Sequence, residues 1–370
     1  MIQPETQAPS ADDLKDLQQL RQAIFDEVSK VIVGQHDVIQ QILVSMFSNG
    51  HVLIVGVPGL AKTLLIRTLA DSLQLEFSRI QFTPDLMPSD ITGTEVIQKN
   101  PVTSERELRF IKGPVFANMV LADEINRTPP KTQAALLEAM QEQQVTVGGV
   151  RHELTDPFMV LATQNPIEQE GTYPLPEALL DRFMMQISIR YPVEADELEI
   201  VKRTTSNLQI DLAKKFSQQR INELVSVTRQ IPVADHVALY AIRLARLSRM
   251  TKDADEQNFD FVTPALADPF QDLRQFIQGY VRWGAGPRAS QFLVLAGKSR
   301  AALDGRSCVS LDDIRDVAAS VMRHRIRTNF QAGADNVTAD QIVERLIIFL
   351  DKIQLDERGI DAELFRSSSS

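Results

Sequence analysis

Hydrophobic residues in the first half of the chain gather in short runs, with helical periodicity between them. Unbroken apolar runs make up most of the segments at residues 51–56, 119–124 and 158–164, and two further strands are predicted at residues 77–82 and 184–189. Short apolar runs of this kind are typical of strands that are buried on both faces of a parallel sheet. Because helical segments separate the strands, we predict an α/β fold, with a parallel sheet flanked by helices.

The chain begins with a polar stretch, and helical periodicity follows it directly. Residues 1–13 are predicted to be a flexible tail, in which Ser10 and Asp13 resemble a capping box for the next helix. Aliphatic residues then recur at intervals of three or four. This spacing predicts an amphipathic helix with a buried face formed by Leu14, Leu17, Leu20, Ile24 and Val28.

The pattern changes after Tyr191-Pro192, where strand-like runs give way to helical periodicity in the rest of the chain. A chain of 370 residues is also long enough to form two hydrophobic cores. We therefore predict one domain at residues 14–192, a mainly helical second domain at 193–362 and a short tail at 363–370.

A glycine-containing loop, GVPGLAKT at residues 56–63, directly follows the first predicted strand and opens a helix. This strand–loop–helix order is the context that a phosphate-binding loop requires. The two glycines allow backbone N–H groups to face a phosphate, Lys62 reaches further phosphate oxygens, and the Thr63 hydroxyl can ligate Mg²⁺. We predict that this loop binds ATP through Gly56, Val57, Pro58, Gly59, Leu60, Ala61, Lys62, Thr63 and Leu64.

Ala61 departs from the usual pattern of such loops, which has a glycine immediately before the lysine. We expect Ala61 to lie in the first helical turn, where φ is negative and a methyl group is tolerated. Taken by itself, the motif is also compatible with a strand–helix turn that binds no ligand.

An acidic pair, Asp123 and Glu124, ends the predicted strand MVLADE downstream of the phosphate-binding loop. The carboxyl ends of strands are where open α/β sheets bind their ligands. We predict that Asp123 and Thr63 hold Mg²⁺, while Glu124 orients and deprotonates the attacking water. An isolated acidic pair is usually a solvated turn, but the loop upstream argues against that alternative.

Three further polar residues are candidates for the same reaction. Asn165 ends the segment FMVLATQN and can hold the nucleophilic water, although a simple loop amide has the same pattern. Arg182, in LLDRF, suits the charge on a transferring phosphoryl group, and an ion pair with Asp181 or Glu177 is the alternative. Arg288, in GAGPRAS, opens a helix of the second predicted domain, where a surface arginine is the alternative.

Together these motifs resemble the AAA+ superfamily of P-loop ATPases and, within it, the MoxR branch. The resemblance rests on GVPGLAKT, FIKGPVFANMVLADEINR, ATQNPIEQEGTYPLPEALLDRF and WGAGPRA, and it spans residues 30–300. In MoxR-like sequences an alanine often replaces the last glycine of the phosphate-binding loop. The resemblance implies an AAA+ ATPase core with a helical lid domain, and ATP and Mg²⁺ as cofactors.

The resemblance also implies a role for each candidate residue. In such proteins the arginine finger enters the site of a neighbouring subunit, which implies a ring, usually of six copies. Whether the second sensor acts on its own or a neighbour's nucleotide stays open, because the lid is displaced in this clade. The roles fall on Lys62 and Thr63 (phosphate-binding motif), Asp123 and Glu124 (Walker B pair), Asn165 (first sensor), Arg182 (arginine finger) and Arg288 (second sensor).

Segments around the site are also implied by the resemblance. Ile32, Val33 and Gly34 match the segment that lies against adenine. Residues 83–113 match the helix-2 insert of this clade, and residues 145–154 match its hairpin before the first sensor. Gly148-Gly149 between two alternating arms is by itself a hairpin signal. In such proteins both inserts typically line the pore of the ring.

The function that the resemblance implies is that of an ATP-driven chaperone. MoxR-like proteins assist the maturation, activation or metal insertion of client complexes, commonly together with a von Willebrand factor A domain protein. Three alternatives could use the same core: a nucleic-acid motor, a magnesium-chelatase-like motor subunit and a nucleotide-gated scaffold without catalysis. The catalytic candidates argue against the scaffold.

The charge of the chain argues against a protein that coats nucleic acid. Its net charge is -10, whereas binding to phosphate backbones depends on lysine and arginine. For the densest basic cluster we favour a solvated helix face or a subunit contact over DNA binding. This cluster consists of Arg323, His324, Arg325 and Arg327.

Composition also bears on the compartment. The single cysteine, Cys308, excludes an internal disulfide, and we expect it to be a buried, inert thiol. The first residues lack the basic start and apolar core of a secretory signal, and no stretch is apolar enough to cross a bilayer. We therefore expect a cytoplasmic protein without a membrane span, and the five scattered histidines argue against a structural metal.

Overall fold

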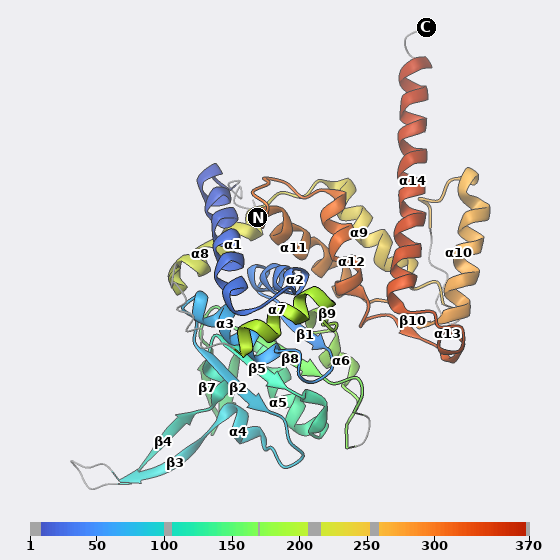
Figure 1. Cartoon of the computed structure of the whole chain (residues 1–370). Coiled ribbons are helices and arrows are strands. Elements are labelled where there is room, and N and C mark those ends of the chain that lie inside the picture. Colours follow the sequence, from blue (N-terminus) through green and yellow to red (C-terminus); the bar gives the residue numbers. More distant parts are fainter. Residues whose placement is uncertain (1–8, 100–105, 169–170, 206–215, 252–258, 368–370) are drawn as a thin grey trace. The chain divides into compact units, whose positions relative to one another are not determined.

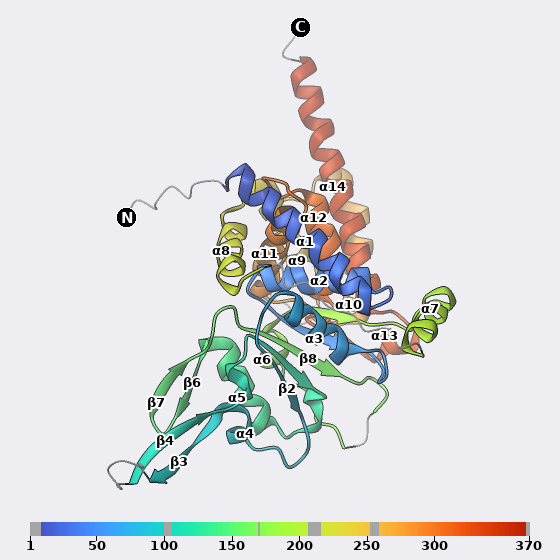
Figure 2. The ribbon, with the colours of Figure 1, turned by 60° about the vertical axis from the view of Figure 1, so that its left-hand side comes forward.

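The computed structural model describes residues 9–99, 106–168, 171–205, 216–251 and 259–367 of the chain (Figures 1 and 2). No helix within these ranges combines the length and the apolar character that a membrane crossing requires. Each of the two compact units into which the chain divides is described by itself below.

The first unit comprises Met1–Ile231 together with Ala302–Ser307, and the second comprises Pro232–Ala301 and Cys308–Ser370. The boundary therefore differs from the predicted domain boundary at residue 192. The reason is packing: the two helices that follow residue 192 in the described chain belong to the first unit, where Arg203 Nη1 donates to the carbonyl of Ser29 at 2.8 Å.

The first unit is built on a five-stranded sheet in the order β2-β5-β8-β1-β9, in which every neighbouring pair is parallel. The predicted α/β fold with a parallel sheet is therefore confirmed. The three central strands are buried except for their last residues, so their partly exposed side chains lie at the carboxyl edge. The strands are β1 (His51–Val55), β2 (Phe77–Gln81), β5 (Met119–Asp123), β8 (Met159–Gln164) and β9 (Phe183–Ser188).

Helices pack around this sheet, and the first of them matches the predicted pattern. Its N-cap Ser10 accepts a hydrogen bond from the N–H of Asp13 at 3.1 Å, and the five aliphatic residues predicted to form its inner face are buried. The helix begins at Ala11, so the predicted tail of residues 1–13 is wrong for its last residues. The helices are α1 (Ala11–Val31), α2 (His36–Phe47), α3 (Lys62–Ser72), α4 (Pro88–Thr92), α5 (Pro130–Glu142), α6 (Glu177–Leu180), α7 (Glu194–Thr204) and α8 (Gln218–Gln230).

Two antiparallel hairpins belong to the first unit. The predicted hairpin at 145–154 is confirmed: β6 (Gln144–Val147) pairs with β7 (Val150–Glu153), and both turn glycines have positive φ. The second hairpin pairs β3 (Gly93–Lys99) with β4 (Arg106–Lys112), inside the predicted insert at 83–113, and it extends away from the sheet in both views (Figures 1 and 2).

The second unit is mainly helical, as predicted. Its last helix continues to Ser367, into the segment predicted to be a tail at 363–370. Two short strands, β10 (Val281–Trp283) and β11 (Arg327–Thr328), pair antiparallel. The helices are α9 (Asp235–Leu247), α10 (Ala267–Tyr280), α11 (Pro287–Leu303), α12 (Leu311–Met322), α13 (Phe330–Ala334) and α14 (Ala339–Ser367).

The structure contradicts one expectation for this region in part and another in full. His324 and Arg325 are buried, and the Arg325 guanidinium lies 5.0 Å from the ring centroid of Phe292, so these two residues are not on a solvated helix face. The positive charge of Arg325 therefore serves packing against an aromatic ring. Cys308 is exposed, because it lies in the loop ahead of α12 and not in the core as expected.

Candidate functional site

The loop between β1 and α3 lies at the carboxyl edge of the sheet, where β1 runs between β8 and β9. Gly56 starts this loop, and its N–H donates to the carbonyl of Gln164 at 3.3 Å. A Cβ at Gly56 would lie 3.0 Å from the Ile189 carbonyl oxygen, so a larger residue would have to push the two backbones apart. Gly59 has φ +86°, a conformation that side chains of L-residues rarely adopt.

Ala61 has φ 52° and ψ 24°, the left-handed conformation, immediately before α3. The expectation of a negative φ at this residue is therefore wrong. The chain changes direction between the loop and α3, and Ala61, the residue before the helix, makes this turn with its left-handed conformation. A left-handed alanine costs about 1 kcal/mol relative to an unstrained conformation, because its Cβ crowds the following carbonyl.

Lys62 is the first residue of α3, and its ammonium donates to the carbonyl of Gly56 at 2.6 Å, so the side chain folds back over the loop. Burial lowers the pKa of Lys62, and the carboxylates of Asp123 and Glu124 act in the opposite direction. The lysine therefore lies in a partly desolvated place near two negative charges. Such a cation binds phosphate oxygens more strongly than one in bulk water does.

A cavity of about 470 Å³ opens in front of this loop. It brings together most of the predicted nucleotide-binding loop, the acidic pair and the predicted sensor, along with two residues of β2. Its lining residues are Pro58, Gly59, Leu60, Ala61, Lys62, Thr63, Leu64, Arg79, Gln81, Asp123, Glu124 and Asn165.

Thr163 holds the acidic pair in place from the neighbouring strand. Its hydroxyl donates to Asp123 Oδ1 at 2.6 Å and accepts from the N–H of Glu124 at 2.9 Å. Thr163 itself is only 1% exposed, so this contact is shielded from water. Glu124 has φ 57°, and the bond to its N–H stabilises this sharp turn at the end of β5. The predicted pair is thus fixed by a residue that the motifs did not indicate.

Two residues of β2 that we did not predict also contact the acidic pair. Arg79 Nη2 donates to Asp123 Oδ2 at 2.6 Å, and Gln81 Nε2 donates to Glu124 Oε2 at 2.9 Å. Both face the cavity because residues two apart on a strand share a face. The alternation of polar residues in FSRIQF is the only sequence signal for them, and it does not show which strand lies beside β2.

Glu124 has a second charged neighbour. Arg127 Nε lies 3.1 Å from Glu124 Oε2, and the same guanidinium pairs with Glu168. The carboxylate proposed to act on water is therefore held at one oxygen by Gln81 and Arg127 together. A base that is held in this way keeps its orientation while a proton is transferred.

Asn165, the predicted first sensor, lies one residue beyond the end of β8 and lines the cavity. The residue is buried, and its Oδ1 accepts from the N–H of Ile167 at 3.1 Å. This bond orients the side-chain amide, so that the NH₂ group is the part left to contact a ligand or water.

Other predicted site residues do not line the cavity, as far as the described residues define it. Arg182 is half-buried just after α6, where its N–H donates to the carbonyl of Leu179 at 3.0 Å. Ile32 and Val33 lie between α1 and α2, and Gly34 packs so closely on Asp196 that a Cβ there would be 2.6 Å from Asp196 Oδ2. Arg288 is the second residue of α11, in the second unit.

The chemistry of the cavity suits a magnesium nucleotide. The Thr63 hydroxyl and the Asp123 carboxylate line it together, and hard oxygen donors are the ligands that Mg²⁺ prefers. The lysine ammonium and the backbone N–H groups at the start of α3 suit phosphate oxygens. The residues present therefore fit both groups.

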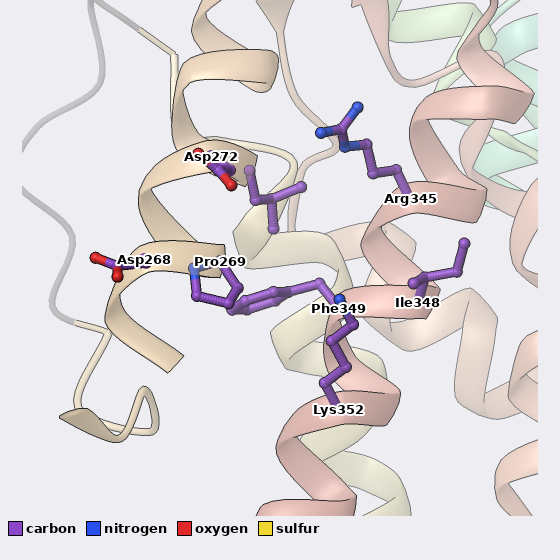
Figure 3. A pocket seen from close by; sticks show the side chains of 8 residues that line it. Asp268, Pro269, Asp272, Arg345, Ile348, Phe349 and Lys352 are labelled. Atoms are coloured by element: carbon purple, nitrogen blue, oxygen red, sulfur yellow. The ribbon is translucent and has the colours of Figure 1, made fainter. Parts of the chain in front are cut away.

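A second cavity, of about 330 Å³, lies between α10 and α14 in the second unit (Figure 3). The Phe349 side chain extends from α14 toward Pro269 and forms an apolar floor. Its charged residues are Asp268 and Asp272 on α10 and Arg345 and Lys352 on α14. This cavity has no glycine loop and no strand ends, so it lacks the backbone N–H cradle of a phosphate-binding loop.

Two family models match the chain. The ATPase family associated with various cellular activities (AAA) matches residues 51–185, and the AAA lid domain matches residues 274–346. The first range contains the loop, the acidic pair, the buried threonine, the predicted sensor and the predicted arginine finger.

Known proteins are similar over most of the chain. Chaperone MoxR1 of Mycobacterium tuberculosis is 39% identical over 328 residues, which cover 89% of this chain and 81% of that protein. Protein MoxR of Paracoccus denitrificans is 30% identical over 80% of this chain and 85% of that protein. The solved structure of a candidate ATPase from Cytophaga hutchinsonii has a TM-score of 0.79 and 39% identity, covering 91% of this chain and 96% of that one.

Proposed function

The chain belongs to the MoxR family of AAA+ ATPases, and from this premise we propose that it hydrolyses ATP to drive the remodelling of partner protein complexes. The observation that carries this proposal is the convergence of Lys62, Asp123, Glu124 and Asn165 on one cavity at the carboxyl edge of the sheet.

In the proposed reaction the loop from Gly56 to Thr63 cradles the phosphates, and Lys62 leaves the carbonyl of Gly56 for a phosphate oxygen. Thr63 and Asp123 would hold Mg²⁺, which would supply positive charge to neutralise the phosphates. Lys62, Thr63 and Asp123 all line the cavity, which supports these roles.

Glu124 accepts a proton from the attacking water, and Asn165 holds that water through its side-chain NH₂ group. Gln81 and Arg127 keep the Glu124 carboxylate oriented through 2.9 Å and 3.1 Å contacts. General bases of this kind contribute about 10²–10⁴-fold to a rate.

Assembly completes the proposed site. We propose a ring, most simply of six copies, in which Arg182 enters the site of the neighbouring subunit and Arg288 senses a bound nucleotide. Arginine fingers supplied in trans accelerate phosphoryl transfer by about 10³–10⁵-fold. Ile32, Val33 and Gly34 are proposed to lie against adenine. The lid domain is proposed to move with each round of ATP hydrolysis.

The proposed clients are protein complexes that require maturation, activation or metal insertion. A von Willebrand factor A domain protein is proposed as the partner in this activity. The relative in Mycobacterium tuberculosis is named a chaperone, which supports this class of client. The two hairpins, β3–β4 and β6–β7, are the proposed contacts to a client in the pore.

The test of the shared site is ATP hydrolysis per subunit over a wide range of protein concentration. Specific activity should rise with concentration, and Arg182→Ala should lower it about 10³-fold while nucleotide binding persists. Arg67→Ala is the matched control, because Arg67 is an exposed arginine of the same unit, paired with Asp71 at 3.9 Å. Activity that is flat with concentration and unaffected by Arg182→Ala would refute the ring.

A further inference from the structure

The two oxygens of the Asp123 carboxylate have different kinds of partner. Oδ1 accepts from the buried hydroxyl of Thr163, which the sheet shields from solvent. Oδ2 accepts from Arg79, through Nη2 at 2.6 Å and Nε at 3.1 Å. The Arg79 side chain is 48% exposed, whereas that of Asp123 is 14% exposed. One oxygen is therefore held by a fixed neutral donor, and the other by a cation that can exchange with solvent.

Arg79 reaches Asp123 from the edge strand of the sheet. In the parallel register of β2 and β5, Gln81 lies beside Asp123, so the Arg79 side chain extends forward along β2 by two residues to make this contact. Its Nη2 also donates to Gln81 Oε1 at 2.6 Å. The guanidinium thus lies on the wall of the same cavity that the loop and the acidic pair line.

We propose that Arg79 is a competing cation at Asp123, which a divalent metal must displace before it can use Oδ2. A guanidinium and a dication at the same carboxylate oxygen repel each other, and the repulsion is stronger beside a partly buried group than in water. The inference rests on the proposed function, since it concerns the metal of that site. It assigns Arg79 to control of metal binding and not to the chemical step.

This arrangement couples the metal to the nucleotide. Phosphate oxygens in the cavity would offer the released guanidinium a new anionic partner, because arginine pairs well with phosphate. Metal binding is then unfavourable while Arg79 holds Asp123, and it becomes favourable when phosphates draw Arg79 away. The protein would take up its metal together with the nucleotide and resist free metal.

The experiment measures the affinity for Mn²⁺ alone, by electron paramagnetic resonance of the full-length protein without nucleotide. Arg79→Met keeps the length of the side chain and removes its charge, and it should bind Mn²⁺ about two- to fivefold more tightly, the range expected for a partly exposed ion pair. Arg79→Lys keeps a charge and should stay near wild type. Arg67→Met, which removes an exposed arginine from α3, should change nothing.

A second arm locates the effect. In an Asp123→Asn background, Arg79→Met should no longer tighten Mn²⁺ binding, because the contested carboxylate is gone. With saturating ADP present, the gain from Arg79→Met should shrink, since phosphates already draw the arginine away. Equal or weaker Mn²⁺ affinity in Arg79→Met, or a gain that persists in Asp123→Asn, would overturn the proposal.

Nucleotide binding is measured separately with a fluorescent ADP. If the wild-type protein fails to bind this probe, the proposed function is wrong, whatever Mn²⁺ shows. If the probe binds and Arg79→Met shows no gain in Mn²⁺ affinity, only the role of Arg79 is wrong. A purely structural arginine would lower metal affinity on removal or leave it unchanged, so a gain identifies competition.

Discussion

Two cavities of this molecule carry charges of both signs, but the chain builds them differently. The first draws its polar groups from the loop after β1 and from the ends of β2, β5 and β8, four segments far apart in sequence. The second lies between α10 and α14, and its charges follow the helices at intervals of four and seven residues. A parallel sheet gathers side chains at one edge, whereas a helix pair spreads them along its length.

The contacts inside each cavity follow from this difference. At the sheet edge, polar groups of different strands bond to one another, as Thr163 and Arg79 do with Asp123. Between the helices, Arg345 lies 4.2 Å from the ring centroid of Phe276, a contact that stabilises packing. In this molecule, strand ends therefore place opposite charges around one point, whereas the two helices keep theirs apart.

Among the variants that compare the two cavities, the removal of one lysine from each is expected to give the largest difference. Lys62→Ala should lower ATP hydrolysis by about 10²-fold or more, because a preorganised cation at the phosphates is lost. Lys352→Ala, an exposed lysine of the second cavity, should stay within about twofold of wild type. Steady-state assays compare the ATPase rates of the two variants. Equal losses of rate would contradict the assignment of ATP hydrolysis to the cavity at the sheet edge.

Acid should lower the stability of the first unit because of His51, the first residue of β1. Its Nδ1 accepts from the N–H of Val160 at 3.1 Å, and burial lowers its pKa from 6.5 to about 4. Below pH 6.5 the unfolded chain binds a proton that the folded chain refuses, so stability falls as pH drops toward 4. We expect this residue to account for about 2 kcal/mol of lost stability at pH 5.

Denaturant unfolding at pH 7 and pH 5, followed by circular dichroism, checks this expectation. His51→Asn keeps an acceptor near Val160 but has no group that gains a proton in this range. The free energy of unfolding of this variant should therefore fall less between pH 7 and pH 5 than that of the wild type, by the contribution expected of His51. In the second unit, burial raises the pKa of Tyr240, which stays neutral in acid and should contribute nothing. An unchanged pH dependence in His51→Asn would contradict the assignment.

Thr163 tests whether the bonds between strand ends serve catalysis. Thr163→Val removes the hydroxyl that contacts Asp123 Oδ1 and the N–H of Glu124, and it should lower the ATPase rate about tenfold, the value of a bond to a charged group. Thr163→Ser keeps the hydroxyl and should restore most of the rate. The ATPase rates of both variants are measured over a range of Mg²⁺ concentrations. A Thr163→Ser variant as slow as Thr163→Val would show that packing, and not hydrogen bonding, determines the rate.

The smallest effect concerns the backbone of the loop. Ala61→Gly should raise the free energy of unfolding by up to about 1 kcal/mol, because glycine adopts the left-handed conformation without crowding. Ala70→Gly, within α3, should lower it by about 1 kcal/mol or more, as glycine weakens helices. Urea titrations of the two variants should therefore move in opposite directions, and a destabilised Ala61→Gly would argue against the observed φ.

Much of the first unit follows from local pattern. The buried strands, the phosphate loop and the acidic pair are each visible because their residues are contiguous in the chain. The same holds for the hairpin around Gly148-Gly149, where two glycines with positive φ set the turn. Local signals of this kind need no knowledge of which strand lies beside which.

Other features could not be predicted because they depend on neighbours in space. Arg79 contacts Asp123 only through the register of β2 and β5, and Thr163 contacts it through β8. The β3–β4 hairpin was not predicted because charged residues interrupt its alternation of polar and apolar residues. Its apolar residues are also not all buried, since Ile97 is 69% exposed. The left-handed φ of Ala61 reflects the path of the loop, which overrides the preference of its residue type.

The central claim is that the cavity at the sheet edge hydrolyses ATP with Glu124 as the base, and Glu124→Gln tests it most directly. In single-turnover experiments with Mg-ATP, this variant should bind nucleotide as wild type does and hydrolyse it about 10²–10⁴-fold more slowly. Hydrolysis at the wild-type rate, with binding intact, would contradict the account, because the proton would then leave the water by another route.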